Sequence, residues 1–349
     1  MFFASDNWAG AHPKIVEGLA RHASGFSPAY GSSDLDKQVE QTFSKIFERD
    51  VAVFFVGTGT AANSLAMSAV SRPGGVAFAH REAHMIADEG GAPEFLTGGG
   101  RLSPVDGTLG RIAAATLETE IGRYPPQFVH AGQPAAVSIT QATEIGTVYS
   151  LDEIDAIAGV AQRHGLQLHM DGARFANALV SLDVSAAEMT WKRGVDIVSF
   201  GGTKNGCWCA EAVVFLDPAK AHDFPFIRKR AAQLFSKSRF IAAQFEAYFA
   251  DDLWLETARH SNAMASRLAG HLAASSKAWL GWEPQANEIF PIIKLETVET
   301  LRAQGAAFYP WHPPFGFAGS IAEDETMCRF VTSFATTPDH VDQIGDLIA

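Results

Sequence analysis

Cysteine is scarce in this chain, with three residues, Cys207, Cys209 and Cys328, among 349. An odd and sparse count argues against a disulfide framework and is typical of the reducing cytoplasm. Cys207 and Cys209 form a C-x-C motif, but no second cysteine pair accompanies it at zinc-ligand spacing. We therefore interpret this motif as two small buried thiols. We expect a cytoplasmic protein without a metal site.

Long apolar runs and an excess of basic residues are also absent. No run approaches the roughly 20 apolar residues that a membrane span needs. Residues 1–7 lack the basic and apolar regions of a signal peptide, so we expect no leader. Lysine and arginine number 27 against 39 aspartates and glutamates, for a net charge of −12. This balance argues against nucleic acid or an anionic membrane as the main partner. An anionic ligand would be held by local groups, such as helix N-termini and single arginines.

Apolar segments alternate with helical patterns through the first two thirds of the chain. The segments that are typical of buried strands are residues 51–55, 76–79, 136–139, 166–169, 197–200 and 212–215. Residues 34–49, 61–70 and 151–164 have the spacing of amphipathic helices. Alternating strands and helices predict an α/β fold with a mostly parallel sheet covered by helices on both faces.

The pattern divides the chain into three parts. Residues 1–30 lack clean periodicity, and we interpret them as an N-terminal arm. Residues 31–240 form the predicted large α/β domain. Residues 241–349 form a smaller C-terminal α+β domain, which follows a long helical connector within residues 228–275.

Two short motifs carry the strongest functional signal. Asp171 and Lys204 each follow an apolar strand, and the 33 residues between them fit one strand–helix–strand unit. Both side chains are therefore expected at the carboxyl ends of nearby parallel strands, where open α/β sheets bind ligands. An acid that pairs with a pyridinium nitrogen and a lysine that forms a Schiff base are what pyridoxal phosphate requires. Taken singly, Lys204 is more often an ordinary solvated lysine, and Asp171 could instead be a helix N-cap, a frequent use of aspartate.

The segment Gly57-Thr58-Gly59-Thr60 lies between a predicted strand and a predicted helix. Its N–H groups, hydroxyls and helix dipole make a phosphate seat. Gly57-x-Gly59-x-x-Ala62 also matches a dinucleotide fingerprint, with Glu82 about 20 residues later. The segment alone fits a nicotinamide enzyme and a pyridoxal enzyme equally well, and the Asp171/Lys204 pair favours the second.

Several histidines and arginines have two interpretations each. His84 follows a strand and could stack on a ring or act as a base, although any one of 12 histidines is more often incidental. His130 precedes a polar loop that either faces a site or forms a surface turn. Arg174 could contact a ligand or form a structural ion pair. Arg329 lies in an apolar strand, where either a substrate carboxylate or a buried acid would pair with it.

In their order along the chain, these motifs resemble those of the low-specificity L-threonine aldolases, which are fold-type-I pyridoxal-phosphate enzymes. The matching stretches are residues 4–8, 29–34, 57–63, 80–84, 88–92, 133–144, 169–177, Lys204 and 329–332. The resemblance implies retro-aldol cleavage of L-threonine, L-allo-threonine and related β-hydroxy-α-amino acids to glycine and an aldehyde. It also implies a homodimer or homotetramer.

The resemblance implies a role for each candidate residue. Lys204 would carry pyridoxal 5'-phosphate, Asp171 would pair with the pyridine nitrogen, and Arg174 would lie beside the ring. The phosphate would be held by Thr58, Gly59 and Thr60. His84 would stack on the ring and, with His130, would lie near the substrate hydroxyl. The substrate carboxylate would be bound by Ser5, Arg174 and Arg329.

Two departures from the family pattern surround the lysine. Thr203 stands where serine is more frequent, and residues 205–209 replace a Gly-Leu-Gly-Ala-Pro segment. Both could alter the aldehyde preference. Other reactions on the same fold, β-elimination or transamination, remain alternatives, because a fold does not fix its chemistry.

Overall fold

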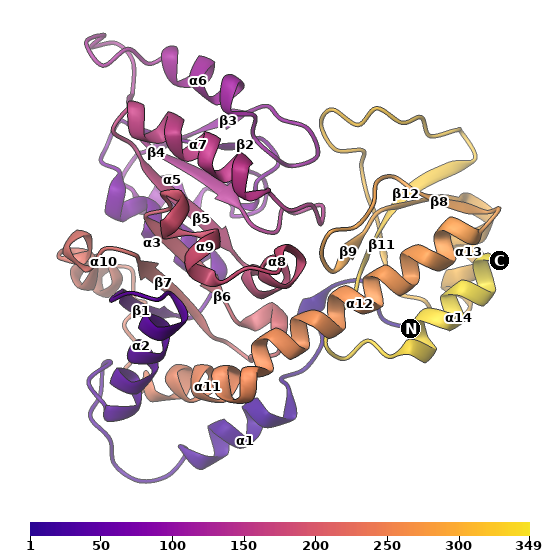
Figure 1. Cartoon of the computed structure of the whole chain (residues 1–349), viewed down its shortest axis with the longest axis horizontal. Helices are drawn as coiled ribbons and strands as arrows, with labels where there is room; N and C mark the ends of the chain where they lie inside the picture. The colour runs from indigo at the N-terminus through magenta and orange to yellow at the C-terminus, as the bar shows by residue number, and fades with distance from the viewer.

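Two units joined by one long helix make up the protein in the computed structural model, which describes residues 1–349 (Figure 1). The large unit contains a seven-stranded sheet in the order β1-β7-β6-β5-β4-β2-β3. Its strands are β1 (Ala52–Val56), β2 (Gly75–His80), β3 (Arg101–Val105), β4 (Gln133–Thr140), β5 (Gln167–Gly172), β6 (Ile197–Gly201) and β7 (Glu211–Phe215). Only β7 is antiparallel to the other strands. The predicted α/β fold with a mostly parallel sheet is confirmed.

Helices cover both faces of this sheet. One face packs on α3 (Gly59–Val70), with α5 (Ala92–Leu96) and α10 (Phe224–Arg230) beside it. The other face packs on α2 (Asp34–Ile46), α7 (Leu151–Arg163), α8 (Phe175–Leu182) and α11 (Arg239–Phe249). The remaining helices of this unit are α1 (Pro13–Arg21), α4 (His84–Ala87), α6 (Ala114–Gly122) and α9 (Ala186–Met189).

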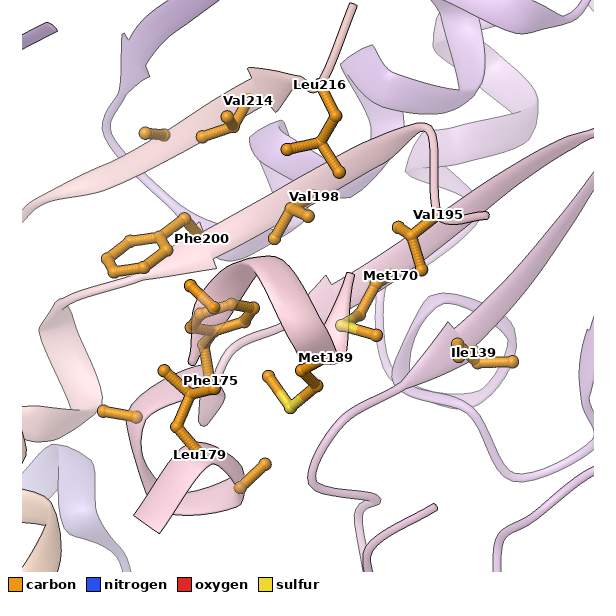
Figure 2. Close-up of a cluster of buried hydrophobic side chains, with 14 of the residues drawn as sticks. Ile139, Met170, Phe175, Leu179, Met189, Val195, Val198, Phe200, Val214 and Leu216 are labelled. Atoms are coloured by element: carbon orange, nitrogen blue, oxygen red, sulfur yellow. The ribbon is translucent and has the colours of Figure 1, made fainter. Parts of the chain in front are cut away.

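The central strands are apolar on both faces because both faces are buried. All five residues of β6 are buried, and its side chains alternate between the two layers of core. Figure 2 shows one of these layers, in which side chains of β4, β5, β6 and β7 face those of α8 and α9. Phe200 packs within this layer, with the ring of Phe43 5.1 Å away and that of Phe175 also 5.1 Å away.

The small unit is built on a second, antiparallel sheet. Its strands are β8 (Ala278–Leu280), β9 (Glu288–Ile289), β10 (Pro291–Lys294), β11 (Tyr309–Pro310) and β12 (Glu325–Val331). Its helices are α13 (Leu295–Ala303) and α14 (Pro338–Ile348), and α12 (Leu253–Ala274) joins it to the large unit (Figure 1). Phe3 lies in the core of this unit, so both chain termini belong to it.

The first 30 residues are more ordered than their sequence pattern suggests. His12 caps α1 and Pro13 occupies its first turn, and the helix packs on α11. Lack of long periodicity concealed this nine-residue helix. Phe245 and Tyr248 of α11 lie in the large core. We therefore propose that the boundary between the units lies in α12 rather than at residue 240.

No helix of the structure combines the length and the apolar character that crossing a membrane requires. The three cysteines are free thiols. Cys207 and Cys328 are buried, but Cys209, which was expected to be buried, is partly exposed. No group of three or more histidine, cysteine, aspartate or glutamate side chains is arranged to hold a metal ion.

The aromatic core predicts a clear stability difference. Phe43 is fully buried against Phe200, Phe245 and Phe249. Phe43→Ala should lower the free energy of unfolding by about 3–5 kcal/mol, because it removes apolar contacts and leaves a cavity. Phe26→Ala is the matched control, since Phe26 is fully exposed. Urea denaturation measures both, and equal losses would contradict this description of the core.

Candidate active site

A cleft of about 910 Å³ opens where the strands of the large sheet end. The segments after β1, β2, β4, β5 and β6 all contribute to its wall. Glu211 reaches the same edge because β7 runs in the opposite direction and begins there. The small unit and the N-terminal segment close the other side, through Ser5, Glu288 and Arg329 among others. The cleft therefore lies at the carboxyl edge of the sheet, between the two units.

Asp171 and Lys204 lie in this one cleft, as predicted. Asp171 lies near the end of β5 and Lys204 follows β6, and these two strands are parallel neighbours. Asp171 is buried, and its Oδ2 accepts a hydrogen bond of 2.7 Å from Asn63 Nδ2. Gly201 allows the two strand ends to approach, since a Cβ there would lie 2.7 Å from the carbonyl oxygen of Ala173. Asp171 is thus fixed in direction before any ligand binds.

The phosphate seat predicted at residues 57–60 is the N-terminus of α3. Thr58 is the N-cap, and its Oγ1 accepts a hydrogen bond of 3.1 Å from the N–H of Ala61. The first N–H groups of a helix have no carbonyl partner within it and attract anions. No atom lies within 4 Å of the place where a Cβ of Gly59 would be. Thr58, Gly59 and Thr60 all line the cleft.

The dinucleotide interpretation of the same segment does not agree with the sheet order. A dinucleotide fingerprint requires a strand, a helix and a second parallel strand close by. Here β1 is an edge strand that pairs only with the antiparallel β7, and β2 lies near the opposite edge. Glu82 Oε1 accepts a hydrogen bond from the N–H of Phe315 at 2.9 Å, so it is already used to hold the small unit.

His84 begins α4 and lines the cleft. Its Nδ1 lies 3.0 Å from Glu89 Oε1, and this hydrogen bond raises the pKa of His84 above its ordinary value. Asn63 donates to Glu89 at 2.7 Å as well as to Asp171, so one amide links the two acids. His84 and Asp171 are therefore held by a single connected network.

His130 lies outside this cleft. It lies in the segment before β4, with its ring 5.3 Å from that of Phe128. Phe128 and Val129 expose more than half of their surface. A single chain therefore does not bring His130 to the other candidate residues.

The two candidate arginines lie in different electrostatic environments. Arg174 is buried and donates to both oxygens of Asp6, at 2.8 and 3.2 Å, and its Nη1 lies 2.9 Å from Glu288 Oε2. These two carboxylates raise the pKa of Arg174 despite its burial. Arg329 instead lies over the ring of Trp311, with 4.3 Å between its Cζ and the ring centroid. Its Nε has no hydrogen-bond partner, and its Nη2 donates to the carbonyl of Ala4 at 3.4 Å.

Comparison with known proteins agrees with this geometry. The family model described as beta-eliminating lyase matches residues 3–290. The low specificity L-threonine aldolase of Pseudomonas aeruginosa is 41% identical over 343 residues, 98% of this chain and 95% of the relative. The chain belongs to the low-specificity L-threonine aldolase family.

Solved structures support the same assignment. The Leishmania major threonine aldolase has a TM-score of 0.92 at 28% identity and covers 99% of this chain and 98% of its own. A structure of SPT with a PLP internal aldimine has a TM-score of 0.68 at 16% identity, covering 100% of this chain and 86% of its own, which shows the fold alone. The predicted fold type I and the pyridoxal phosphate cofactor are confirmed. The enzyme is a lyase.

The residues present fit this cofactor. A buried acid, a lysine after the next strand and an open helix N-terminus line one cleft. Asp171 would face the ring nitrogen, Lys204 would hold the carbonyl carbon, and α3 would hold the phosphate.

Several residues of the cleft were not found from the sequence. These are Asn63, Glu211, Glu288, Tyr309, Trp311 and His312. Of these, Asn63 could have been found from the sequence, because an amide side chain is unusual in a predicted helix that is mostly apolar. The others follow no motif, and their place depends on the sheet edge and on the packing of the small unit.

The His84–Glu89 pair predicts a measurable change in titration. Glu89→Gln should lower the pKa of His84, because the carboxylate whose hydrogen bond stabilises the imidazolium is lost. NMR of histidine-labelled protein measures the midpoint, with His84→Asn used to assign the signal. Glu94→Gln is the control, since Glu94 lies outside the cleft. An unchanged midpoint in Glu89→Gln would show that Glu89 does not hold the cation.

Proposed function

We propose that the enzyme cleaves L-threonine, L-allo-threonine and related β-hydroxy-α-amino acids to glycine and an aldehyde. The observation that carries this proposal is the single cleft that combines Asp171, Lys204 and His84 with the half-buried Arg329. Cleavage of a β-hydroxy-α-amino acid requires a binding site for the cofactor, a base for the hydroxyl proton and a cation that binds the substrate carboxylate. The relatives described above are named as threonine aldolases, which supports this proposal.

The large unit would hold the cofactor. Lys204 would carry it, Asp171 would keep its pyridine nitrogen protonated, and Thr58, Gly59 and Thr60 would bind its phosphate. Bound pyridoxal phosphate supplies an electron sink for the charge left on the α-carbon when a bond to that carbon breaks. Asn63 would support this by holding Asp171 in place.

The small unit would orient the substrate. Arg329, Ser5 and Arg174 line the side of the cleft that faces it. A carboxylate held there is fixed in direction, and this fixes which bond of the α-carbon is broken. The stacked ring of Trp311 limits the motion of Arg329 and leaves its charge free.

His84 would remove the proton of the β-hydroxyl. Its Nδ1 is hydrogen-bonded to Glu89, which leaves Nε2 for the substrate. As a base it must be neutral, so the rate should rise with pH through the raised pKa of His84.

His130 would contribute only in an assembly. We propose a homodimer or homotetramer in which this histidine of one chain approaches the cleft of another. The exposed apolar side chains of Phe128 and Val129 beside it support an interface there. The free cysteines support a cytoplasmic location.

A β-eliminating activity is the second candidate, because the matching family model has that description. Product analysis distinguishes the two. Purified protein with pyridoxal phosphate should convert L-threonine or L-allo-threonine to equal amounts of glycine and acetaldehyde. Ammonia with 2-oxobutyrate in place of these products would establish elimination instead. Absence of any product with both substrates would reject the proposed substrates.

Lys204→Ala should abolish turnover with the fold intact, because no other lysine lines the cleft. We expect loss of several orders of magnitude in kcat and of the covalently bound chromophore, with an unchanged circular dichroism spectrum. Lys45→Ala is the control, since Lys45 is an exposed residue of α2. Wild-type turnover in Lys204→Ala would reject the role of this lysine.

A further inference from the structure

Glu288 is a buried carboxyl group that the proposed reaction does not use. It is the first residue of β9 and is held opposite Val331 of β12. Only 1% of its surface is exposed, and it lines the cleft. Neither of its carboxyl oxygens accepts a hydrogen bond, although Oε2 lies 2.9 Å from Arg174 Nη1. Burying a carboxylate without hydrogen bonds is costly, so this arrangement calls for a function.

The contacts of Arg174 indicate what the function of Glu288 is. A guanidinium binds carboxylates along its edges, with two parallel N–H groups. Asp6 occupies the edge formed by Nε and Nη2. The edge that remains includes Nη1, and Glu288 stands beside it. A substrate carboxylate approaching Arg174 therefore meets Glu288 at the only edge that Asp6 leaves free.

The charges around Glu288 make this competition strong. Asp6 and Glu288 together outweigh the single positive charge of Arg174. The other charged groups that face Glu288 are Arg329 from β12 and Lys204 from the turn after β6. A further carboxylate would be the third around Arg174. Protonation of Glu288 would remove one of these charges and would supply an O–H donor.

We propose that Glu288 competes with the substrate carboxylate for Arg174, so that an amino acid binds with uptake of one proton by Glu288. This inference rests on the proposed carboxylate site at Arg174 and Arg329. Burial raises the pKa of Glu288 and so favours its neutral form. Amino-acid affinity is then greatest below the pKa of Glu288 in the free protein. It falls as pH rises above that value, by up to tenfold for each pH unit.

Glycine and methylamine together isolate this effect. Both react with the bound cofactor through an amine and change its absorbance, but only glycine carries a carboxylate. The ratio of their dissociation constants, measured in the holoenzyme from about pH 6 to pH 9, reports the carboxylate site alone. In the wild type the preference for glycine should decline with rising pH. In Glu288→Gln it should be independent of pH and larger than in the wild type at the alkaline end.

Glu211→Gln is the matched control. Glu211 is also a buried acid of the cleft, and burial raises its pKa to about 7, but it lies at the start of β7 beside Thr203. Its removal should leave the pH dependence of the ratio as in the wild type. Methylamine affinity should be the same in Glu288→Gln and the wild type.

Calorimetry of the wild type tests the proposal without any variant. Titrations in buffers of different ionisation enthalpy should show that, above the pKa of Glu288 in the free protein, glycine takes up about one more proton than methylamine does. No difference in proton uptake would overturn the proposal. So would weaker glycine binding in Glu288→Gln at every pH, because Glu288 would then be a direct ligand of the substrate.

These outcomes are separate from those of product analysis. If threonine is not cleaved but glycine shows the expected pH dependence, the proposed reaction fails and the role of Glu288 stands. If glycine binds no more tightly than methylamine, the carboxylate site itself is absent, and the inference about Glu288 fails with it.

Discussion

The direct pairing of β5 with β6 is the constraint on which the site depends. It places Asp171 opposite Ser199 and brings the next strand end, with Lys204, to the same edge. This approach is possible because Gly201 has no side chain to meet Ala173. The pairing is held in turn by the apolar layers on both faces of β6. The position of two reactive groups thus follows from the packing of a strand that carries neither group within it.

Much of this arrangement could be predicted from the sequence, because buried parallel strands consist of short apolar runs of residues. The acid and the lysine were found because each follows such a run. The edge strand β3 escaped notice, since Arg101 and Pro104 interrupt its apolar pattern. Asn63 and Glu288 act through partners far away in the chain. The bond from Asn63 to Asp171 spans 108 residues, and no local pattern records it.

Acidic side chains make the charge of the cleft depend on pH. Burial raises the pKa of both Glu144 and Glu211 to about 7, and the pKa of Glu288 is also raised. Glu144 accepts a hydrogen bond from the N–H of His84, so one of these acids lies at the proposed base. A site with several carboxyl groups near their midpoint gains and loses protons when a charged ligand enters. On the proposed roles of His84 and Glu288, substrate affinity and proton transfer would depend on neighbouring groups of the same cleft.

Arg174 and Arg329 differ in charge environment, and each belongs to a different unit. Arg174 follows a strand of the large sheet and is held by Asp6 and Glu288, so its charge is cancelled before a ligand arrives. Arg329 belongs to the small unit and is held by the face of Trp311, which restricts its motion without neutralising it. An aromatic ring orients a cation without cancelling its charge, whereas a carboxylate orients a cation and offsets its charge. On the proposed function, the small unit would offer the free charge for the substrate, and the large unit would hold the cofactor. The aldehyde preference should depend on the residues between them, where Tyr309 and Trp311 meet the cleft.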